Sequence, residues 1–137
     1  MYNSIIVAVD PAHGERGAQM IAQAKLLLAP DAKVTLVSVL AELPGYVNFE
    51  IPAEIRRNAE TNTQDALSEL AAKNDLKQAQ MNVRHGVPHR EILDAATETK
   101  ADLIIVASHK PGLEDYLLGS TAGKVVRHAR CSVLVVR

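Results

Sequence analysis

The chain has 137 residues, of which 47% are hydrophobic and 23% are charged, so it has the composition of a globular protein, and residues 1–137 are expected to form one domain with a single core. Its net charge of −1 offers no basic field to a polyanion, which argues against nucleic acid as a partner. The single cysteine, Cys131, excludes an intrachain disulfide. The sequence shows no basic leader and no apolar run of the ~20 residues that span a bilayer. We therefore expect a cytoplasmic protein without a membrane partner.

The first half of the chain predicts two buried strands joined by a helix. Residues 4–9 form a continuous, β-branched apolar run, which is typical of a strand covered on both faces. Apolar residues then recur at helical spacing from residue 15 to residue 29, where Pro30 ends the pattern. Residues 34–40 form the second apolar run, and a segment with Pro44, Gly45 and Pro52 follows it.

The second half of the chain predicts three more strands separated by helices. The helical pattern over residues 53–73 is the longest, and it places Ile55, Ala59, Ala66 and Leu70 on one side. The other expected elements are a strand over residues 80–85, a helix that starts near Pro88 and turns Ile92, Leu93 and Ala96 inward, a strand over residues 102–107, a helix marked by Val125, Val126 and Ala129, and a strand over residues 132–136.

Strands and helices thus alternate from one end of the chain to the other. Alternation of this kind favours parallel strands with right-handed crossover connections, because each helix returns the chain to the same end of the sheet. We therefore predict an α/β domain with a five-stranded parallel sheet that is doubly wound and has helices on both faces.

The predicted topology indicates where a ligand would bind. In open sheets of this kind, ligands bind beyond the carboxyl ends of the strands, where the strand order reverses. The loops over residues 10–15, 40–52 and 107–121 are the candidates, whereas the turn over residues 86–88 is too short to contribute much. Loops of such length often pack over a site or carry function.

The start of the last helix is the strongest candidate for binding an anion. Backbone N–H groups, two hydroxyls and the positive end of the helix dipole converge at Gly119, Ser120 and Thr121. A structural alternative makes Ser120 a simple N-cap and Gly119 a turn residue. Across the same crevice, Asp10 can accept hydrogen bonds from a ribose hydroxyl, or it can serve as a turn residue beside Pro11.

Other chemistry has little support in the sequence. His85 and His89 are four residues apart, but Gly86 and Pro88 lie between them, so they cannot share a helix face as a zinc pair would. The chain has neither a G-x-S-x-G nucleophile elbow nor a G-x-G-x-x-G after its first strand. Cys131 is expected to be a small, buried or half-buried filler. We therefore predict no catalytic residue and no metal site.

The whole chain resembles the universal stress protein family in its short, single-domain form, and it is similar to the bacterial F-type and G-type members. The resemblance rests on residues 5–10 with Asp10, on Gly86-Val87-Pro88 before the third helix, and on residues 101–106. Its most specific part is the closing series over residues 117–120, 125–129 and 131–137. It implies the adenine nucleotide alpha-hydrolase-like fold and the binding of ATP or another adenine nucleotide, with or without Mg²⁺.

The phosphate loop of this chain departs from the family pattern G-x2-G-x9-G-[S/T]. Ala107 stands at the first glycine and Lys110 at the second, and only eight residues separate Lys110 from Gly119. The helix start still offers N–H groups, and Lys110 can add a positive charge near phosphates. The resemblance assigns Asp10 to the ribose, Ala8, Val9 and Val39 to the adenine pocket, and Ala107, Ser108, His109, Lys110, Gly119, Ser120 and Thr121 to the phosphate loop.

The last strand is expected to lie at an edge of the sheet, where a partner strand can pair with its uncovered backbone groups. In the family such edges pair antiparallel across a twofold axis. The resemblance therefore implies a homodimer, while the alternative is an edge shielded by the charge of Arg137. The predicted interface consists of Val133, Leu134, Val135 and Val136.

Two functions from different classes fit these observations. The first is a dimeric, ATP-binding regulatory protein of the stress response, with at most slow ATP hydrolysis or self-phosphorylation at Ser120 or Thr121. The second is a dimeric interaction module that works without nucleotide, which the missing glycines at positions 107 and 110 favour. An efficient ATPase or kinase lacks a general base and an acidic pair for a metal, because Glu114 and Asp115 have no partner that the sequence can place.

Overall fold

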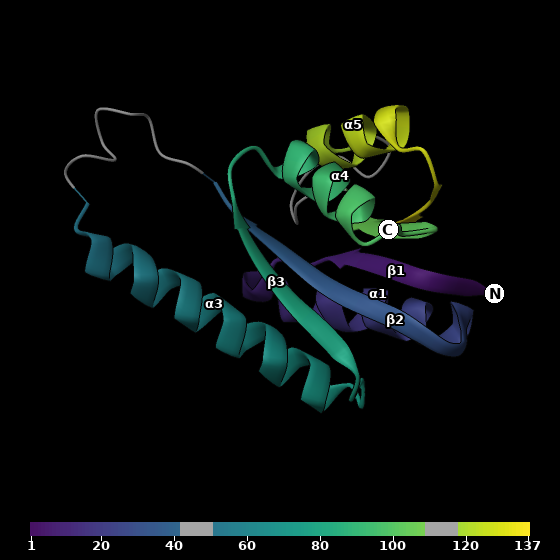
Figure 1. The fold of residues 1–137 in the computed structure, drawn as a ribbon, viewed down its shortest axis with the longest axis horizontal. Coiled ribbons are helices and arrows are strands. Elements are labelled where there is room, and N and C mark those ends of the chain that lie inside the picture. The colour runs from purple at the N-terminus through teal and green to yellow at the C-terminus, as the bar shows by residue number, and fades with distance from the viewer. Residues whose placement is uncertain (42–50, 109–117) are drawn as a thin grey trace.

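The computed structural model describes residues 1–41, 51–108 and 118–137. The elements alternate as the sequence predicts, and Figure 1 shows them on one parallel sheet. In chain order they are β1 (Tyr2–Ala8), the short 3₁₀ helix η1 (Pro11–His13), α1 (Gly14–Leu27), β2 (Leu28–Leu40), α3 (Ala53–Lys73), β3 (Ala79–His85), α4 (Pro88–Glu98), β4 (Leu103–Ala107), α5 (Ser120–His128) and β5 (Ser132–Val136).

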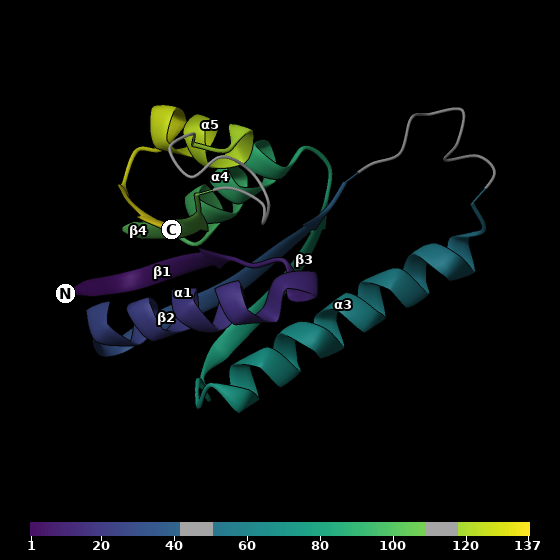
Figure 2. The same cartoon turned by 180° about the vertical axis from the view of Figure 1, so that it is seen from behind.

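The sheet has the strand order β3-β2-β1-β4-β5, and every pair of neighbouring strands is parallel. The chain builds outward from β1 to β3, returns to the other side of β1 with β4, and continues to β5. Figure 2 shows α1 and α3 on one face of the sheet and α4 and α5 on the other. The prediction of a five-stranded, doubly wound parallel sheet is confirmed, and the order reverses between β1 and β4.

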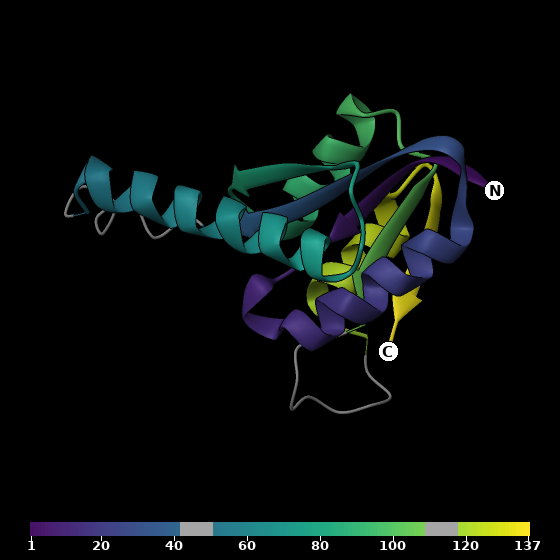
Figure 3. The ribbon, with the colours of Figure 1, turned by 90° about the horizontal axis from the view of Figure 1, so that it is seen from below.

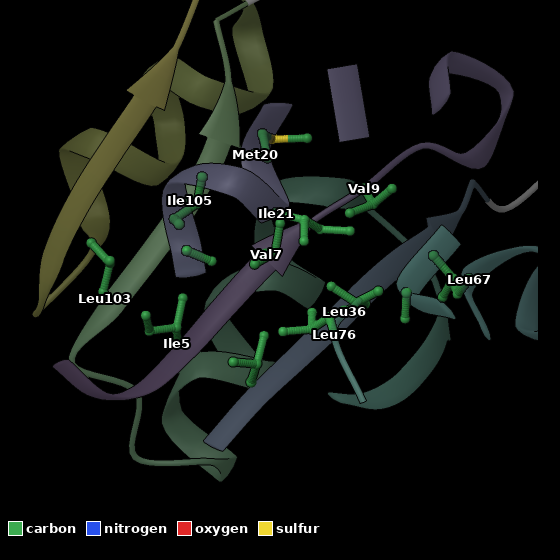
Figure 4. Close-up of a cluster of buried hydrophobic side chains, with 13 residues drawn as sticks. Ile5, Val7, Val9, Met20, Ile21, Leu36, Leu67, Leu76, Leu103 and Ile105 are labelled. Carbon is green, nitrogen blue, oxygen red and sulfur yellow. The ribbon is translucent and has the colours of Figure 1, made fainter. Parts of the chain in front are cut away.

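Period-two alternation divides each apolar strand between two cores. In β1, Ile5 and Val7 face α1 and α3, whereas Ile6 faces α4 and α5, and all three are fully buried. Figure 4 shows the first of these cores, where Met20 and Ile21 of α1 lie among the strand side chains. We call the buried set on this side the α1–α3 cluster; it contains Ile5, Val7, Val9, Met20, Ile21, Ala24, Val34, Leu36, Leu67, Ala71, Leu76, Leu103 and Ile105. The α4–α5 cluster on the other side contains Ile6, Val37, Ile92, Ala95, Ala96, Ile104, Val106, Ala122 and Val125.

The largest departure from the predicted bounds is at the start of β2. The helix was expected to run to residue 29 and the strand to begin at residue 34, but α1 ends at Leu27 and β2 begins at Leu28. Pro30 lacks the N–H that a helix interior requires, so the chain becomes extended before it. The pairing with β1 then shifts between Tyr2 and Ser4, and Asp31 takes a φ of 62°, which indicates a bulge that carries extra residues of β2.

The expected inner side of α3 is correct only for the second half of that helix. Ile55 is 57% exposed and Ala59 is exposed as well, whereas Ala66 and Leu70 are partly buried and Leu67 is fully buried. Figure 3 shows the reason, because the first turns of α3 extend beyond the end of the sheet and have no surface to cover. A periodic pattern identifies the helix but does not reveal how much sheet lies beneath it.

Candidate functional site

A cleft of about 740 Å³ opens at the carboxyl ends of β1, β2 and β4. Its volume lies in the range of small-molecule sites, roughly 300–1,000 Å³. Residues of η1, α1, α3, α4 and α5 complete its walls. The cleft therefore lies where the strand order reverses, as the topological rule predicts.

The cleft brings together residues that the sequence analysis drew from distant segments. Every described residue that was predicted to contact a nucleotide lines it, while His109 and Lys110 lie outside the described residues. Whether these residues bind a nucleotide stays a prediction, but their convergence is a structural fact. The lining members of the predicted set are Ala8, Val9, Asp10, Val39, Ala107, Ser108, Gly119, Ser120 and Thr121.

Asp10 fills the turn role that the sequence offered for it, and its ribose role stays a prediction. One carboxylate oxygen accepts a hydrogen bond from the backbone N–H of Ala12 at 3.0 Å, so Asp10 caps η1 as a turn aspartate does. The other oxygen lies 3.8 Å from Nε2 of His13, and 59% of the Asp10 side chain is exposed. The cap fixes the carboxylate at the mouth of the cleft without burying it, so it remains able to accept hydrogen bonds from a ligand.

The start of α5 differs from the structural alternative considered for it. Gly119 is the N-cap, and Ser120 is the first helical residue, so the interpretation of Ser120 as an N-cap is wrong. No side chain caps this helix start within the described residues. The first N–H groups of α5 therefore lack the described side-chain acceptor that usually satisfies such groups. Since Ser120, Thr121 and Ala122 line the cleft, an anion in the cleft can accept from this helix start.

A series of hydrogen bonds joins the end of β4 to α5 and β5. The N–H of Gly119 donates to the carbonyl oxygen of Ser108, and the N–H of Ser108 donates to the carbonyl oxygen of Val136 at 2.9 Å. The same Val136 oxygen accepts a longer hydrogen bond of 3.4 Å from Nη1 of Arg16 in α1. Ser108 itself is buried. These bonds hold Ser108 and Gly119 in a fixed position against the sheet.

Part of the cleft wall comes from helical residues that no sequence motif identified. Positions 13, 16 and 20 lie three and four residues apart on η1 and α1, which is the spacing of one helix face. Asn62, Thr63 and Ala66 of α3 form a second such group. Helical spacing was the only sequence signal for these lining residues, but the same spacing is typical of a helix face that packs in the core. The additional lining residues are Pro11, Ala12, His13, Arg16, Met20, Val37, Ser38, Leu40, Ala41, Asn62, Thr63, Ala66, Pro88, Ile92, Val106 and Ala122.

The turn that was judged too short contributes after all. Pro88 begins α4 and lines the cleft together with Ile92. Gly86 has a φ of 137°, a conformation that side-chain-bearing residues rarely adopt, and so it directs the chain sharply from β3 into α4. Three residues therefore suffice to place the first turn of a helix in the wall of the site.

Cys131 and the histidine pair lie outside the cleft. Nε2 of His85 contacts Oε1 of Glu60, which links β3 to α3, whereas His89 belongs to α4. Cys131 packs against the α4–α5 cluster, and its burial, together with the negative charge of Asp102, raises the pKa of its thiol. A raised pKa keeps the thiol protonated and weakly nucleophilic, in line with the predicted role of a filler.

Two features are absent from the described ranges of the chain. No three His, Cys, Asp or Glu side chains converge there in the manner of metal ligands. No helix in the same ranges combines the length and the apolar composition that are needed to cross a bilayer.

Strand β5 lies at the edge of the sheet, as predicted, and pairs with β4 on its inner side. Its residues Val133 to Val136 are partly buried because their side chains pack over the two faces: Leu134 and Val136 against the α1–α3 cluster, and Val133 and Val135 against the α4–α5 cluster. The outer backbone groups of β5 thus remain the part of this strand that a partner could pair with.

Comparison with known proteins gives the same assignment from sequence and from structure. The model of the universal stress protein family matches residues 1–137. Universal stress protein G of Escherichia coli O157:H7 is 31% identical over 144 aligned positions, which cover all of both chains.

Solved structures show the same fold. The hypothetical protein MJ0577 has a TM-score of 0.83 and 25% identity, with 99% of this chain and 96% of that chain covered. A universal stress protein in complex with cAMP has a TM-score of 0.66 and 22% identity, with 99% and 97% covered. The universal stress protein from Archaeoglobus fulgidus in complex with dAMP has a TM-score of 0.63 and 22% identity, with 99% and 98% covered.

Proposed function

The chain belongs to the universal stress protein family, and we propose that within it this protein is a dimeric regulator of the stress response that binds ATP or another adenine nucleotide. The observation that carries the proposal is the cleft, which joins an exposed carboxylate, Asp10, to the start of α5, where no described side chain caps the first N–H groups. A ribose hydroxyl requires an acceptor and a phosphate requires donors, so Asp10 and the start of α5 are complementary to the two polar parts of a nucleotide.

An apolar wall supports an adenine ring as the third part of the ligand. Ala8, Val9, Val37 and Val39 line the cleft at the ends of β1 and β2, and all four side chains are apolar. Two neighbours with the same fold were solved with adenine-containing ligands, cAMP and dAMP. The three proteins share an architecture, and we extend the adenine moiety of those ligands to this cleft.

The alanine at position 107 is compatible with this ligand. Ala107 lines the cleft, yet it is only partly exposed and also packs against the α1–α3 cluster. A methyl group that packs against the core intrudes less on a phosphate than one that projects freely. We therefore expect the substitution of the family glycine to lower the affinity rather than abolish binding.

We propose that ATP hydrolysis or self-phosphorylation by this protein is slow at most. In the described part of the cleft, Asp10 is the only carboxylate, and its first oxygen is engaged by the N–H of Ala12. Efficient phosphoryl transfer requires a positioned base and usually an acidic pair for Mg²⁺. Any Mg²⁺ would therefore enter with the nucleotide phosphates, and Ser120 and Thr121 are the hydroxyls best placed to accept a phosphoryl group.

Calorimetric titration with ATP, ADP and AMP tests the proposal directly. We expect saturable binding to the wild-type protein and a marked loss in the Gly119→Val, Ser120→Ala double variant. Gly119 lines the cleft, and its φ of −59° and ψ of 156° are ones that any residue adopts, so a valine adds bulk there without straining the backbone. Gly123→Ala is the matched control in the same helix, since its new methyl group meets only Leu118 Cδ2 at 3.8 Å. Absence of binding at millimolar nucleotide would overturn the proposal.

The dimer is a separate part of the proposal and has its own variant. The N–H and C=O groups of successive strand residues point to opposite sides, and the C=O of Val136 faces β4. The backbone N–H and C=O groups of Val133 and Val135 therefore point to the open edge. A proline at either position removes a donor at that edge without removing a hydrogen bond to β4. We expect Val135→Pro to be monomeric in sedimentation velocity and to bind nucleotide as before. Val135 and Leu134 both pack against a core cluster, but Leu134→Lys is less suitable because it also places a charge there.

The interaction module that works without nucleotide is favoured by one observation, the methyl group of Ala107 in the wall of the cleft. It predicts an intact dimer together with no calorimetric response to any of the three nucleotides. A Val135→Pro variant that retains full regulatory activity would contradict this alternative.

A further inference from the structure

Arg16 is a guanidinium in the cleft that none of the sequence motifs identifies. It lies on α1, its side chain is partly buried, and it lines the cleft. Its one hydrogen bond within the described residues is the 3.4 Å bond from Nη1 to the Val136 oxygen. A guanidinium carries five N–H donors in a planar fork, so most of its donors are not used by the described residues.

The hydrogen bonds around Arg16 fix its place within the cleft. Arg16 and Ser108 donate to the same carbonyl oxygen, that of Val136, and the carbonyl oxygen of Ser108 in turn accepts from Gly119. Arg16 therefore lies at the same end of the cleft as the start of α5. Asn62 and Thr63 line the cleft from α3, which packs on β2 and β3 and so lies at its opposite end.

The charges in the cleft are unevenly distributed. The ionisable residues of its described lining are Asp10, His13 and Arg16. The carboxylate of Asp10 has two neighbours of its own, the N–H of Ala12 and Nε2 of His13, and it forms no salt bridge with Arg16. An arginine stays charged at every physiological pH. Within the described lining, the permanent positive charge and the uncapped helix start therefore occur together.

From this arrangement we propose that Arg16 binds the terminal phosphates of a nucleoside di- or triphosphate, with the first N–H groups of α5 on the other side of the same phosphates. The proposal rests on the proposed nucleotide-binding function and adds to it a phosphate contact from α1. A planar fork matches two phosphate oxygens at once. Affinity consequently rises with the number of phosphates, and the base lies toward α3.

The test compares three ligands on three proteins by calorimetry. The ligands are ATP, adenosine and inorganic tripolyphosphate, and the proteins are the wild type, Arg16→Gln and the matched control Arg57→Gln, which removes an equal charge from an exposed position of α3. Loss of a charge-assisted hydrogen bond corresponds to roughly a 10- to 100-fold weaker affinity. We expect that loss for ATP and tripolyphosphate in Arg16→Gln only, with adenosine unchanged. Arg16→Lys retains the charge without the fork and should lose less.

Each other outcome has a defined meaning. If Arg16→Gln weakens ATP and adenosine equally, Arg16 acts by holding β5 in place, and the proposal is overturned. Equal ATP affinity in wild type and variant overturns it as well. If the wild type binds tripolyphosphate through Arg16 but does not bind adenosine, the phosphate contact is supported and the adenine assignment fails. If the wild type binds none of the ligands, both proposals fail. Circular dichroism melts of all variants identify unfolding, and Arg16→Lys then decides if Arg16→Gln does not fold.

Discussion

Replacing Leu67 with alanine tests how α3 is held to the sheet. Leu67 is fully buried in the α1–α3 cluster, where Leu67 and Ala71 are the buried residues that α3 contributes. Truncating a buried leucine leaves a cavity and lowers the free energy of unfolding by about 2.7–5 kcal/mol. For a domain of this size each kcal/mol corresponds to roughly 3–4 °C in Tm, so the variant should melt about 10 °C lower or more.

The control for this variant lies on the same helix. Ile55 is 57% exposed, and Ile55→Ala leaves no cavity, so its unfolding free energy should stay within about 0.5 kcal/mol of the wild type. Urea unfolding followed by circular dichroism gives both values on one scale. If Ile55→Ala proves as destabilising as Leu67→Ala, the first turns of α3 are covered in solution, and the reasoning from its burial pattern is refuted.

Two further predictions concern charged groups. Burial opposes ionisation of Asp102, but hydrogen bonds from the N–H groups of Asn3 and Ser4 outweigh it and lower its pKa. The stability from this carboxylate is therefore complete above pH ~4 and is lost as the pH falls through the lowered pKa. At pH 7 the unfolding free energy of Asp102→Asn should be lower than that of the wild type by about 1 kcal/mol after solvent screening. Thermal melts at acidic pH should show this difference shrinking; a difference that stays constant with pH would contradict the mechanism. Hydrogen bonds from Arg84 lower the pKa of Glu98, so in Arg84→Met an NMR titration should find that pKa raised toward its ordinary value, and an unchanged titration would disprove the link.

The fold could be predicted from the sequence because its main signals are local. Continuous β-branched runs mark buried strands, and the helix between each pair makes the strands parallel, so the alternation of elements leads to a doubly wound sheet. Helix α3 and strand β5 have the predicted bounds, Ala53–Lys73 and Ser132–Val136. The start of β2 was missed because a proline ends a helix but does not specify whether a loop or a strand follows.

The candidate site was predictable only where chain order dictates position. Asp10 follows strand β1, and Gly119 belongs to the connection from β4 to α5, so the topological rule places both at the carboxyl end of the sheet. Arg16 and Asn62 lie within helices, and which face of a helix lines a cleft depends on how the helix packs. Gly17 illustrates this, since a Cβ there would lie 2.8 Å from Leu70 Cδ2 and 3.1 Å from Val9 Cγ1. Such a close approach of α1 to α3 and β1 is decided by tertiary contacts.

The sequence by itself determined the order of elements, the parallel sheet, the family, and the loops that meet where the strand order reverses, because each of these follows from residue pattern and connectivity. Only the tertiary structure decided that Gly119 rather than Ser120 is the N-cap of α5, that Asp10 is held by Ala12, that half of α3 has no sheet beneath it, and that Arg16 lines the cleft beside the end of β5. These features depend on distances between residues far apart in the chain, and such distances are set when the helices pack on the sheet.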